Sequence, residues 1–399
     1  MPGHESVSKA MTSRDRMNAL LHGDKADRVA LEDSPWDDTL GLWIAEGYPT
    51  TPVPLARGEK RWQEDGRLVA VEEPGPYPEP LPPWKVFGYD MAPAGGWFDW
   101  MPRRGVNELV EETEEWEVRR NGAGGALKYW KHKSGTPEHV DFRMTSRAVW
   151  DRDYRPYLEE TDPARVDVEA ARSALAEARA AGVWAHFGNL GVWEVLRASL
   201  GDIALYESVL LDPDWIRDIV GVYTVFFMKH FARLIDAAGT PDGIWIYDDL
   251  GYRNGLFASP GVLDRLIFPF HRSLVGWLHE RGLPVVLHSC GSQREVLPLV
   301  VEAGYDALNP MERKAAGNDP FLFAERYGDE LAFIGGFDAR ILESNDIPLV
   351  RREVAAYLEG MKARGARLVF GSDHSLSPRV RLATYRAALD AYRRHADYG

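Results

Sequence analysis

The sequence contains very little cysteine and no long apolar run. Cys290 is the single cysteine among 399 residues, so no intrachain disulfide can form. A lone cysteine is typical of proteins in a reducing cytoplasm, which is the location we predict. No stretch of 18 apolar residues occurs, which excludes an ordinary membrane-spanning helix. Residues 1–21 are charged and lack the apolar core of a secretory signal, so we expect no signal peptide.

Basic residues are also scarce. The chain has 47 Lys and Arg against 61 Asp and Glu, which gives a formal charge of −14. Because such a surface repels phosphate backbones and anionic lipids, we expect neither nucleic acid nor a membrane as a partner. The common nucleotide-binding loops, Gly-x-Gly-x-x-Gly and Gly-x-x-x-x-Gly-Lys-Ser/Thr, are absent.

The sequence does contain a regular alternation of short apolar strands and amphipathic helices. Strands are predicted at 27–33, 182–188, 243–249, 284–287, 305–310, 331–336 and 367–372. Strands separated by helices pair in parallel through right-handed crossovers. Polar residues stand at the carboxyl end of strand after strand, namely Glu32, His186, Asp248, His288, Asn309, Asp338 and Asp373. A (β/α)8 TIM barrel keeps its active site there, whereas a doubly wound sheet binds at one crevice, so we predict the barrel.

Residues 50–155 have a different composition. They are rich in proline, glycine and aromatic residues, and Asn121-Gly122 between two alternating runs predicts a β-hairpin. Ordered connections of such length usually cover or line a binding site. We therefore expect a single barrel domain over residues 1–399, in which residues 50–155 form an irregular, hairpin-containing insertion that borders the C-terminal mouth.

The stretch from Pro284 to Gly291, PVVLHSCG, carries the clearest chemical pattern. An apolar strand runs into His288 and Cys290, which lie two residues apart and so point to the same face. Imidazole nitrogen and thiolate sulfur are both zinc ligands, and Gly291 lets the chain turn away. The pattern predicts part of a zinc site, although a buried strand end with a free thiol would look the same.

Two further residues are candidates to complete such a site. His374 follows the last strand, so a closed barrel would bring it to the rim that carries His288; it is the predicted third ligand, or else a histidine that caps the last helix. Glu312 could offer an oxygen ligand, or could pair with Arg313 or Lys314. A site with three protein ligands and an open position is the catalytic form of zinc.

Carboxylates at strand ends are the candidates for proton transfer. Asp248 and Asp249 are adjacent, so one of them should face into the barrel, where it could act as a general acid or base. Both could instead cap a helix or pair with an arginine. Asp338 is a third catalytic candidate, at the end of a later strand.

Substrate contacts are predicted at four positions. His186 and Asn309 stand on strands that lead to the mouth, and Trp36 and Arg143 lie in segments that could close it. His186 could equally be a core histidine. Trp36 and Arg143 could simply pack surface loops.

Several motifs together resemble the uroporphyrinogen decarboxylase (URO-D) superfamily, over roughly residue 182 to the C-terminus. The resemblance rests on His288-Ser-Cys-Gly291, residues 302–310 (EAGYDALNP), 334–338 (IGGFD) and 371–374 (GSDH), and upstream on 248–251 (DDLG) with Ser259-Pro260. The resemblance implies a (β/α)8 barrel with one of two chemistries.

The first branch comprises cofactor-free decarboxylases, which remove acetate carboxyls from a tetrapyrrole and use an arginine-rich N-terminal segment with an aspartate. Here residues 33–37 (DSPWD) stand in place of that segment. The second branch comprises corrinoid-linked methyltransferases, which hold zinc with a His-x-Cys pair and a later cysteine. His288 and Cys290 match the pair, whereas His374 or Asp373 occupies the region of the later cysteine.

The resemblance therefore favours a cytoplasmic, zinc-dependent methyltransferase. It would move a methyl group between a corrinoid on a partner protein and a small acceptor or methylated compound. A decarboxylase of a tetrapyrrole or another polycarboxylate is the alternative; Arg143, Arg253 or Arg340 would then hold carboxylates, and Asp248 or Asp249 would be the acid. A third possibility, from another class, is a non-catalytic barrel that binds a corrinoid or porphyrin.

Overall fold

Eight parallel strands form the centre of the structure, a computed structural model that describes residues 11–63, 68–131 and 137–398. They are β1 (Ala30–Leu31), β6 (Met91–Pro93), β11 (Trp184–Leu190), β12 (Gly243–Tyr247), β15 (Val285–His288), β16 (Ala307–Asn309), β17 (Ala332–Ile334) and β18 (Leu368–Phe370). Their order in the sheet is β1-β18-β17-β16-β15-β12-β11-β6. The backbone N–H of Asp90, next to β6, donates to the carbonyl of Leu31 at 2.8 Å and nearly closes the sheet. The predicted (β/α)8 barrel is confirmed.

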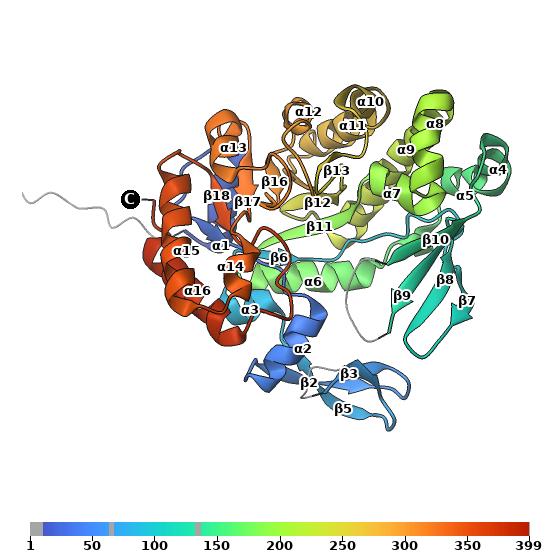
Figure 1. Ribbon diagram of the computed structural model, residues 1–399. Coiled ribbons are helices and arrows are strands. Elements are labelled where there is room, and N and C mark those ends of the chain that lie inside the picture. Colours follow the sequence, from blue (N-terminus) through green and yellow to red (C-terminus); the bar gives the residue numbers. More distant parts are fainter. Residues whose placement is uncertain (1–10, 64–67, 132–136, 399) are drawn as a thin grey trace, which may run out of the picture.

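Helices surround this barrel (Figure 1). They are α6 (Val168–Ala180), α7 (Val192–Leu200), α8 (Asp202–Leu211), α9 (Pro213–Ala238), α10 (Pro260–Leu266), α11 (Phe268–His279), α12 (Leu297–Glu302), α13 (Pro320–Tyr327), α14 (Ala339–Glu343), α15 (Ile347–Lys362) and α16 (Leu382–His395). α9 shows how the sequence sets their limits. Asp212 accepts a hydrogen bond from the backbone of Trp215 and Pro213 takes the first helical position, while Gly239 ends the helix.

The N-terminal end of the barrel is closed by α1 (Ser13–His22). Thr12 caps this helix and Gly23, with a φ of 85°, ends it. Met17 and Leu20 of α1 belong to the same buried apolar cluster as the side chains inside the barrel. The C-terminal end is consequently the open mouth.

A buried ion cluster ties the same end of the barrel together. The Asp90 carboxylate is inaccessible to solvent and accepts hydrogen bonds from Arg16 at 2.6 Å, from Arg28 at 2.9 and 3.0 Å, and from the backbone of Leu31 at 2.8 Å. Arg16 is also buried and pairs with Asp27 at 2.6 Å. Each buried charge thus has an oppositely charged partner, as burial requires.

Residues 50–155 contain most of the structure outside the barrel. β2 (Thr50–Leu55) pairs with β5 (Gly75–Pro80), and β3 (Lys60–Trp62) pairs with β4 (Leu68–Ala70). α3 (Pro83–Phe87) and α4 (Arg147–Asp153) also lie here, and α5 (Arg155–Glu159) begins at the last residue of this segment. Elsewhere, α2 (Asp37–Ala45) follows β1, and β13 (Gly251–Tyr252) and β14 (Gly255–Leu256) form a small ribbon after β12. Barrel strand β6 lies within this segment too, although the sequence did not single it out.

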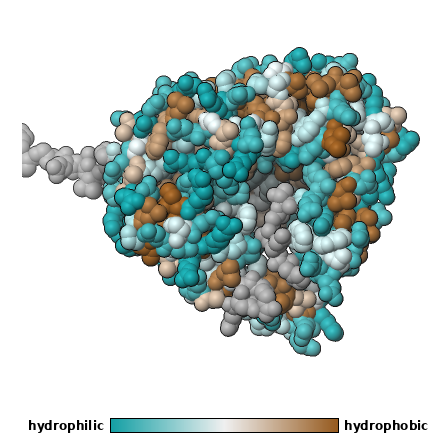
Figure 2. All heavy atoms as spheres, in the orientation of Figure 1, coloured by the Kyte–Doolittle hydropathy of each residue, from teal (hydrophilic) through white to brown (hydrophobic). Residues whose placement is uncertain are grey.

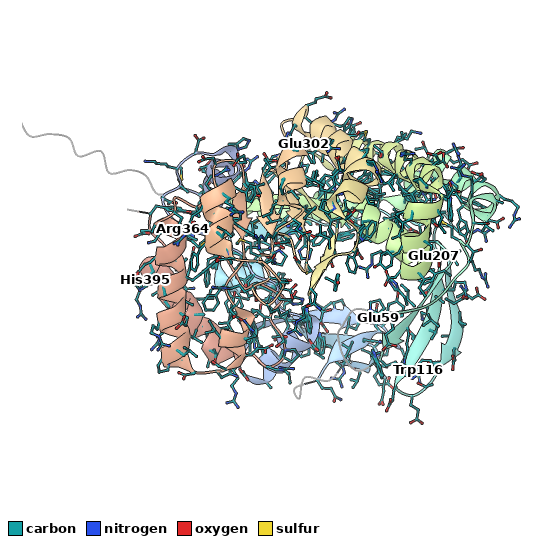
Figure 3. All side chains as sticks on the ribbon, turned by 45° about the horizontal axis from the view of Figure 1, so that its top comes forward. Glu59, Trp116, Glu207, Glu302, Arg364 and His395 are labelled. Atoms are coloured by element: carbon teal, nitrogen blue, oxygen red, sulfur yellow. The ribbon has the colours of Figure 1, made fainter. Side chains whose placement is uncertain are left out.

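The predicted hairpin belongs to a four-stranded antiparallel sheet of β7 (Asn107–Glu112), β8 (Trp116–Asn121), β9 (Gly125–Trp130) and β10 (Glu138–Phe142). β8 and β9 confirm the hairpin, but its turn is longer than a two-residue Asn-Gly turn. The positive φ, 88°, falls on Gly124, and the Asn121 side chain accepts from the backbone of Ala123 and Gly125. β9 and β10 pack against α7, the helix that follows barrel strand β11. In Figure 3, Glu59, which precedes β3, and Trp116 of β8 lie across the molecule from Arg364 and His395.

Strand alternation determines which side chains face the barrel interior. Every strand contributes inward residues to the interior apolar cluster: Ala30, Met91, Trp184, Trp245, Val286, Ala307, Ala332 with Ile334, and Val369. Since side chains alternate, the residues two positions further on also face inward, nearer the mouth. These include Glu32, His186, Tyr247, His288 and Asn309.

Candidate metal centre

Three potential metal ligands meet at the mouth, and they come from the ends of two neighbouring strands. Among the described residues, donor atoms of Asp249, His288 and Cys290 lie within 4.8 Å of one another. Cys290 Sγ is 3.4 Å from His288 Nε2, and Asp249 Oδ1 is 3.9 Å from the same nitrogen. The predicted juxtaposition of His288 and Cys290 is therefore present, and Asp249 joins them.

Asn309 fixes the imidazole ring of His288. Its side-chain nitrogen donates to the carbonyl of Ile334 at 3.2 Å, so its oxygen is left to face His288 Nδ1, at 2.6 Å. A hydrogen bond to this oxygen requires the proton on Nδ1. Nε2, which faces Cys290, then carries the free electron pair that a metal ligand needs.

The turn after Cys290 is held by two carboxylates. The backbone N–H of Cys290 donates to Asp249 Oδ1 at 2.7 Å, and that of Gly291 donates to Glu312 Oε2 at 2.8 Å. Gly291 has a φ of 77°, and a Cβ there would lie 2.5 Å from the backbone of Gly251. Only glycine permits this close approach, which is the role that the sequence suggested for it. Glu312 also pairs with Lys314 at 3.2 Å.

The surroundings of His288 and Cys290 favour the uncharged form of each side chain. Burial lowers the pKa of His288, against the opposing effects of Asp249 and Asn309. Burial, followed by the negative charges of Asp249 and Glu312, raises the pKa of the Cys290 thiol well above its ordinary value. A cation at this point would stabilise the thiolate and neutralise the nearby carboxylates.

Asp248 lies on the other side of β12 and is fully buried. Its carboxylate accepts from the backbone N–H groups of Trp193 and Glu194, at 3.2 and 2.8 Å, and thus holds the start of α7. It also lies 3.1 Å from Nε2 of His271, whose Nδ1 is 2.6 Å from the hydroxyl of Tyr305. Of the two adjacent aspartates, Asp249 is the one beside His288 and Cys290.

His374 lies outside the group of three donors. Its ring packs edge-on against Trp36, with centroids 5.9 Å apart, and its charge lowers the pKa of His288, after the larger effects of burial and hydrogen bonding. The two rings therefore border the mouth on the side of β1 and β18. Ligation by His374 and substrate contact by Trp36 remain predictions.

The remaining predicted residues occupy different parts of the barrel. His186 is buried against Trp245, with ring centroids 4.9 Å apart, and burial lowers its pKa to about 4. Asp338 caps α14 and pairs with Arg340 at 2.6 Å. Arg143 is exposed beside β10, 4.0 Å from Glu108.

Four residues at or near the mouth were not among the predicted site residues. Glu32 and Tyr247 face inward on β1 and β12, and Trp97 lies over Tyr247, with ring centroids 5.2 Å apart. Glu194 of α7 pairs with Arg197 at 2.6 Å and contributes to the high pKa of Cys290. The sequence placed Glu32 at the end of a strand without assigning it a role, and the alternation within β12 could have indicated Tyr247. Trp97 and Glu194 depend on how loops and helices pack.

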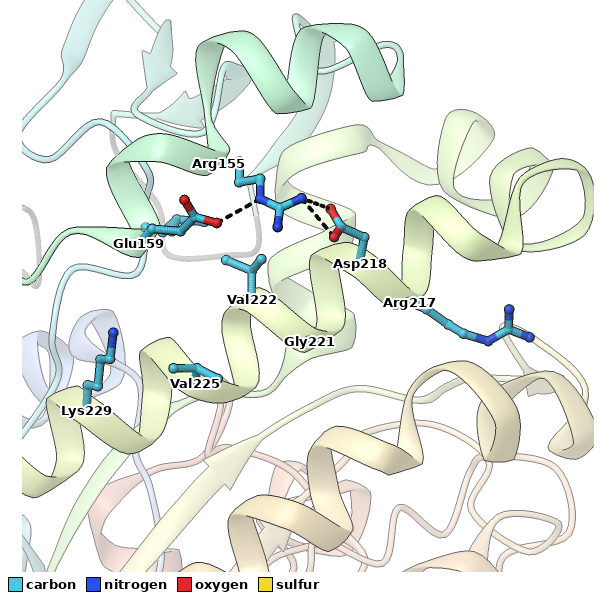
Figure 4. Close-up of a pocket in the computed structure, with 9 residues that line it drawn as sticks. Arg155, Glu159, Arg217, Asp218, Gly221, Val222, Val225 and Lys229 are labelled. Atoms are coloured by element: carbon cyan, nitrogen blue, oxygen red, sulfur yellow. Dashed lines mark hydrogen bonds and ion pairs between the residues drawn. The ribbon is translucent and has the colours of Figure 1, made fainter.

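The outer surface of the barrel carries a separate cavity of about 410 Å³. It lies between α5 and α9, with Val222 and Val225 on its floor and the ion pair of Arg155 and Asp218 beside it (Figure 4). None of the predicted site residues lines it. The surface view shows a hollow near the centre of the face drawn in Figure 2.

Comparisons with known proteins agree with the barrel and with part of the motif pattern. Residues 204–395, from α8 to α16, match the Uroporphyrinogen decarboxylase (URO-D) family. A methyltransferase from Methanosarcina mazei has a similar structure, with a TM-score of 0.63 and 15% sequence identity, over 96% of this chain and 99% of that one. No curated protein sequence matches the chain.

The helices of the described segments include none that is long and apolar enough to cross a membrane. The motifs around His288 and Cys290 lie within the matched residues, and the barrel supplies the fold that they imply. Residues 204–395 are thus similar to the uroporphyrinogen decarboxylase (URO-D) family, in agreement with the resemblance of the motifs, and the methyltransferase from Methanosarcina mazei shares the barrel fold.

Proposed function

We propose that the protein is a zinc-dependent methyltransferase. It would act in the cytoplasm and move a methyl group between a corrinoid on a partner protein and a small acceptor or methylated substrate. The observation that supports this proposal most directly is the convergence of Asp249, His288 and Cys290 at the barrel mouth. The similar fold of the methyltransferase from Methanosarcina mazei is compatible with it.

The donor atoms suit zinc in type and in spacing. Zinc–nitrogen and zinc–sulfur bonds of about 2.0 and 2.3 Å at a tetrahedral angle place the two ligand atoms about 3.5 Å apart. The observed separation of His288 Nε2 and Cys290 Sγ is 3.4 Å. A carboxylate oxygen from Asp249 completes a mixed nitrogen, sulfur and oxygen set, in place of the second cysteine of the related methyltransferases. Three protein ligands would leave one position for a substrate.

Neighbouring residues hold the proposed ligands in position. Asn309 sets the ring orientation of His288, and Asp249 and Glu312 hold the backbone of the turn that carries Cys290. Zinc would supply Lewis-acid activation of the methyl acceptor, or of the atom that the methyl group leaves. The contribution of the protein is to hold the ligands at fixed positions inside a partly closed mouth.

The decarboxylase alternative has less support from the arrangement of charges. Arg340 is paired with Asp338, Arg143 lies on the inserted sheet, and Arg253 is exposed between β13 and β14. Two of these three arginines are thus already paired with carboxylates of the protein, which leaves them less able to hold those of a substrate. The mouth instead presents carboxylates of its own.

Metal analysis of the purified protein tests the proposal. The protein should contain about one equivalent of zinc, and Cys290→Ser and His288→Ala should each lose most of it. His279→Gln is the matched control, since His279 lies on the outer helix α11 and pairs with Asp306 at 2.9 Å. The zinc-loaded protein should also demethylate methylcobalamin in the presence of a thiol, with a change in visible absorbance as the readout.

Two results would contradict the proposal. One is a protein without zinc in which Cys290→Ser has no effect on methyl transfer. The other is decarboxylation of a tetrapyrrole or polycarboxylate that continues in the presence of a strong chelator, which would favour the alternative.

A further inference from the structure

Aromatic rings lead from solvent to the candidate metal centre. Trp97, in the loop after β6, is 48% exposed, and its ring lies 5.2 Å from that of Tyr247 at an angle of 31°. The ring of Tyr247 lies 5.0 Å from the imidazole of His288. A ligand that approaches Cys290 and His288 along this wall would therefore meet aromatic surface first.

Glycines make room for the exposed indole. Gly188 faces inward on β11, and a Cβ there would lie 3.3 Å from the ring of Tyr247 and 3.6 Å from Trp97 Nε1. Its backbone N–H donates to the carbonyl of Gly95 at 3.1 Å, and both Gly95 and Gly96 have positive φ values. The loop is thus anchored to the barrel and holds Trp97 over the barrel interior. The indole stays half exposed there, although full burial would stabilise it more.

A carboxyl group without a cationic partner faces the same space. Glu32 points inward from β1, and among the described residues its carboxyl group makes no hydrogen bond with another side chain or with the backbone. Burial, and then the charge of Asp33, raises its pKa to about 8. The Glu32 charge in turn raises the pKa of Tyr247, after the larger effect of burial, so the two side chains are within electrostatic range.

We propose that the mouth binds a methylated ammonium group, held against the aromatic surface of Trp97 and Tyr247, with the carboxylate of Glu32 as its counter-charge. Aromatic faces attract such cations through the ring quadrupole, and the carboxylate supplies the counter-charge. Asp249 and Glu312 add negative charge nearby, which disfavours an anionic ligand. That this cation is the methyl donor or acceptor rests on the proposed methyltransferase function, whereas its binding does not require the metal.

Matched probes separate the charge of the ligand from its shape. Choline carries a trimethylammonium group, and 3,3-dimethyl-1-butanol has the same shape without the charge. Titration calorimetry at pH 9, above the raised pKa of Glu32 of about 8, should show choline binding about 10-fold more tightly than the alcohol. Anisole serves as the probe for a neutral aromatic methyl ether.

Two variants locate the interaction. Trp97→Leu removes the π face and Glu32→Gln removes the charge, so each should weaken choline binding about 10-fold and change that of the alcohol less than about threefold. Both variants should keep the zinc content of the unaltered protein, because neither residue belongs to the three-donor group. Trp277→Leu, on the outer helix α11, is the control and should leave choline binding unchanged.

The outcomes distinguish this inference from the proposed function. Equal or tighter binding of the alcohol or anisole, or choline binding that survives both Trp97→Leu and Glu32→Gln, would overturn the ammonium site even if zinc is present. Tight choline binding that depends on both residues would support the site, and would do so even if zinc and methyl transfer were absent.

Discussion

The contact between Asn309 and His288 allows a sharp test of the proposed metal centre. Asn309→Ala removes the oxygen that lies 2.6 Å from His288 Nδ1, so nothing holds the proton on that nitrogen or the ring in its present orientation. Loss of such a partner typically lowers metal affinity by about 10–100-fold, which corresponds to about 1.4–2.7 kcal/mol. Competition with a chromogenic chelator would measure the zinc dissociation constant directly.

Asn309→Asp is the matched comparison. Both variants lose the hydrogen bond from the Asn309 amide to the carbonyl of Ile334 at 3.2 Å, but only the alanine variant loses the acceptor for His288. The aspartate variant should therefore bind zinc at least as tightly as the unaltered protein. If the two variants bound zinc with the same affinity, the reasoning about the ring of His288 would be wrong.

Two further predictions concern the stability of the barrel. Asp90→Asn removes a charged partner of the buried Arg16, so urea denaturation should show a free energy of unfolding lower by about 3–5 kcal/mol. Asp214→Asn, in an exposed ion pair, should lower it by less than about 1 kcal/mol. A similar small loss in both variants would contradict this. Since burial lowers the pKa of His186 to about 4, the folded state binds fewer protons there than the unfolded state. The stability of the folded state that depends on neutral His186 is therefore fully present above the unfolded pKa of about 6.5. It is lost as pH falls toward 4, by up to about 3 kcal/mol. His186→Gln should reduce this loss in acid denaturation measurements, and identical pH profiles of stability would refute it.

Most of the barrel could be predicted because each strand has a local signal. Apolar runs such as residues 285–288 and 368–370 are bounded by glycine, proline or polar residues, and helices separate them. β6 had no such signal. It is three residues long, ends at Pro93 within a proline-rich segment, and is defined by its pairing with β11. Strands of this kind depend on tertiary contacts that a local pattern does not contain.

The site was predictable to the extent that it depends on alternation within one strand. His288 and Cys290 are two residues apart, so their common orientation follows from the backbone alone. The choice between Asp248 and Asp249 needed the register of β12 against β15, which pairs Tyr247 with His288. With Tyr247 facing inward, Asp248 turns outward to the start of α7, and Asp249 returns toward the mouth. Such a choice requires knowledge of the neighbouring strand.

The arrangement also indicates how such a barrel could change its substrate without losing the proposed metal centre. The three potential ligands come from the ends of β12 and β15, whereas Trp97 comes from the loop after β6 and Glu32 from β1. In a TIM barrel each loop can vary while the strands that support the others stay in place. Substitutions at Trp97 or Glu32 should therefore alter which compound is bound and leave zinc affinity intact, while substitutions at Asn309 should do the reverse. A variant series in which ligand binding and zinc affinity always changed together would contradict this. It would show that Trp97 and Glu32 are coupled to the three potential metal ligands.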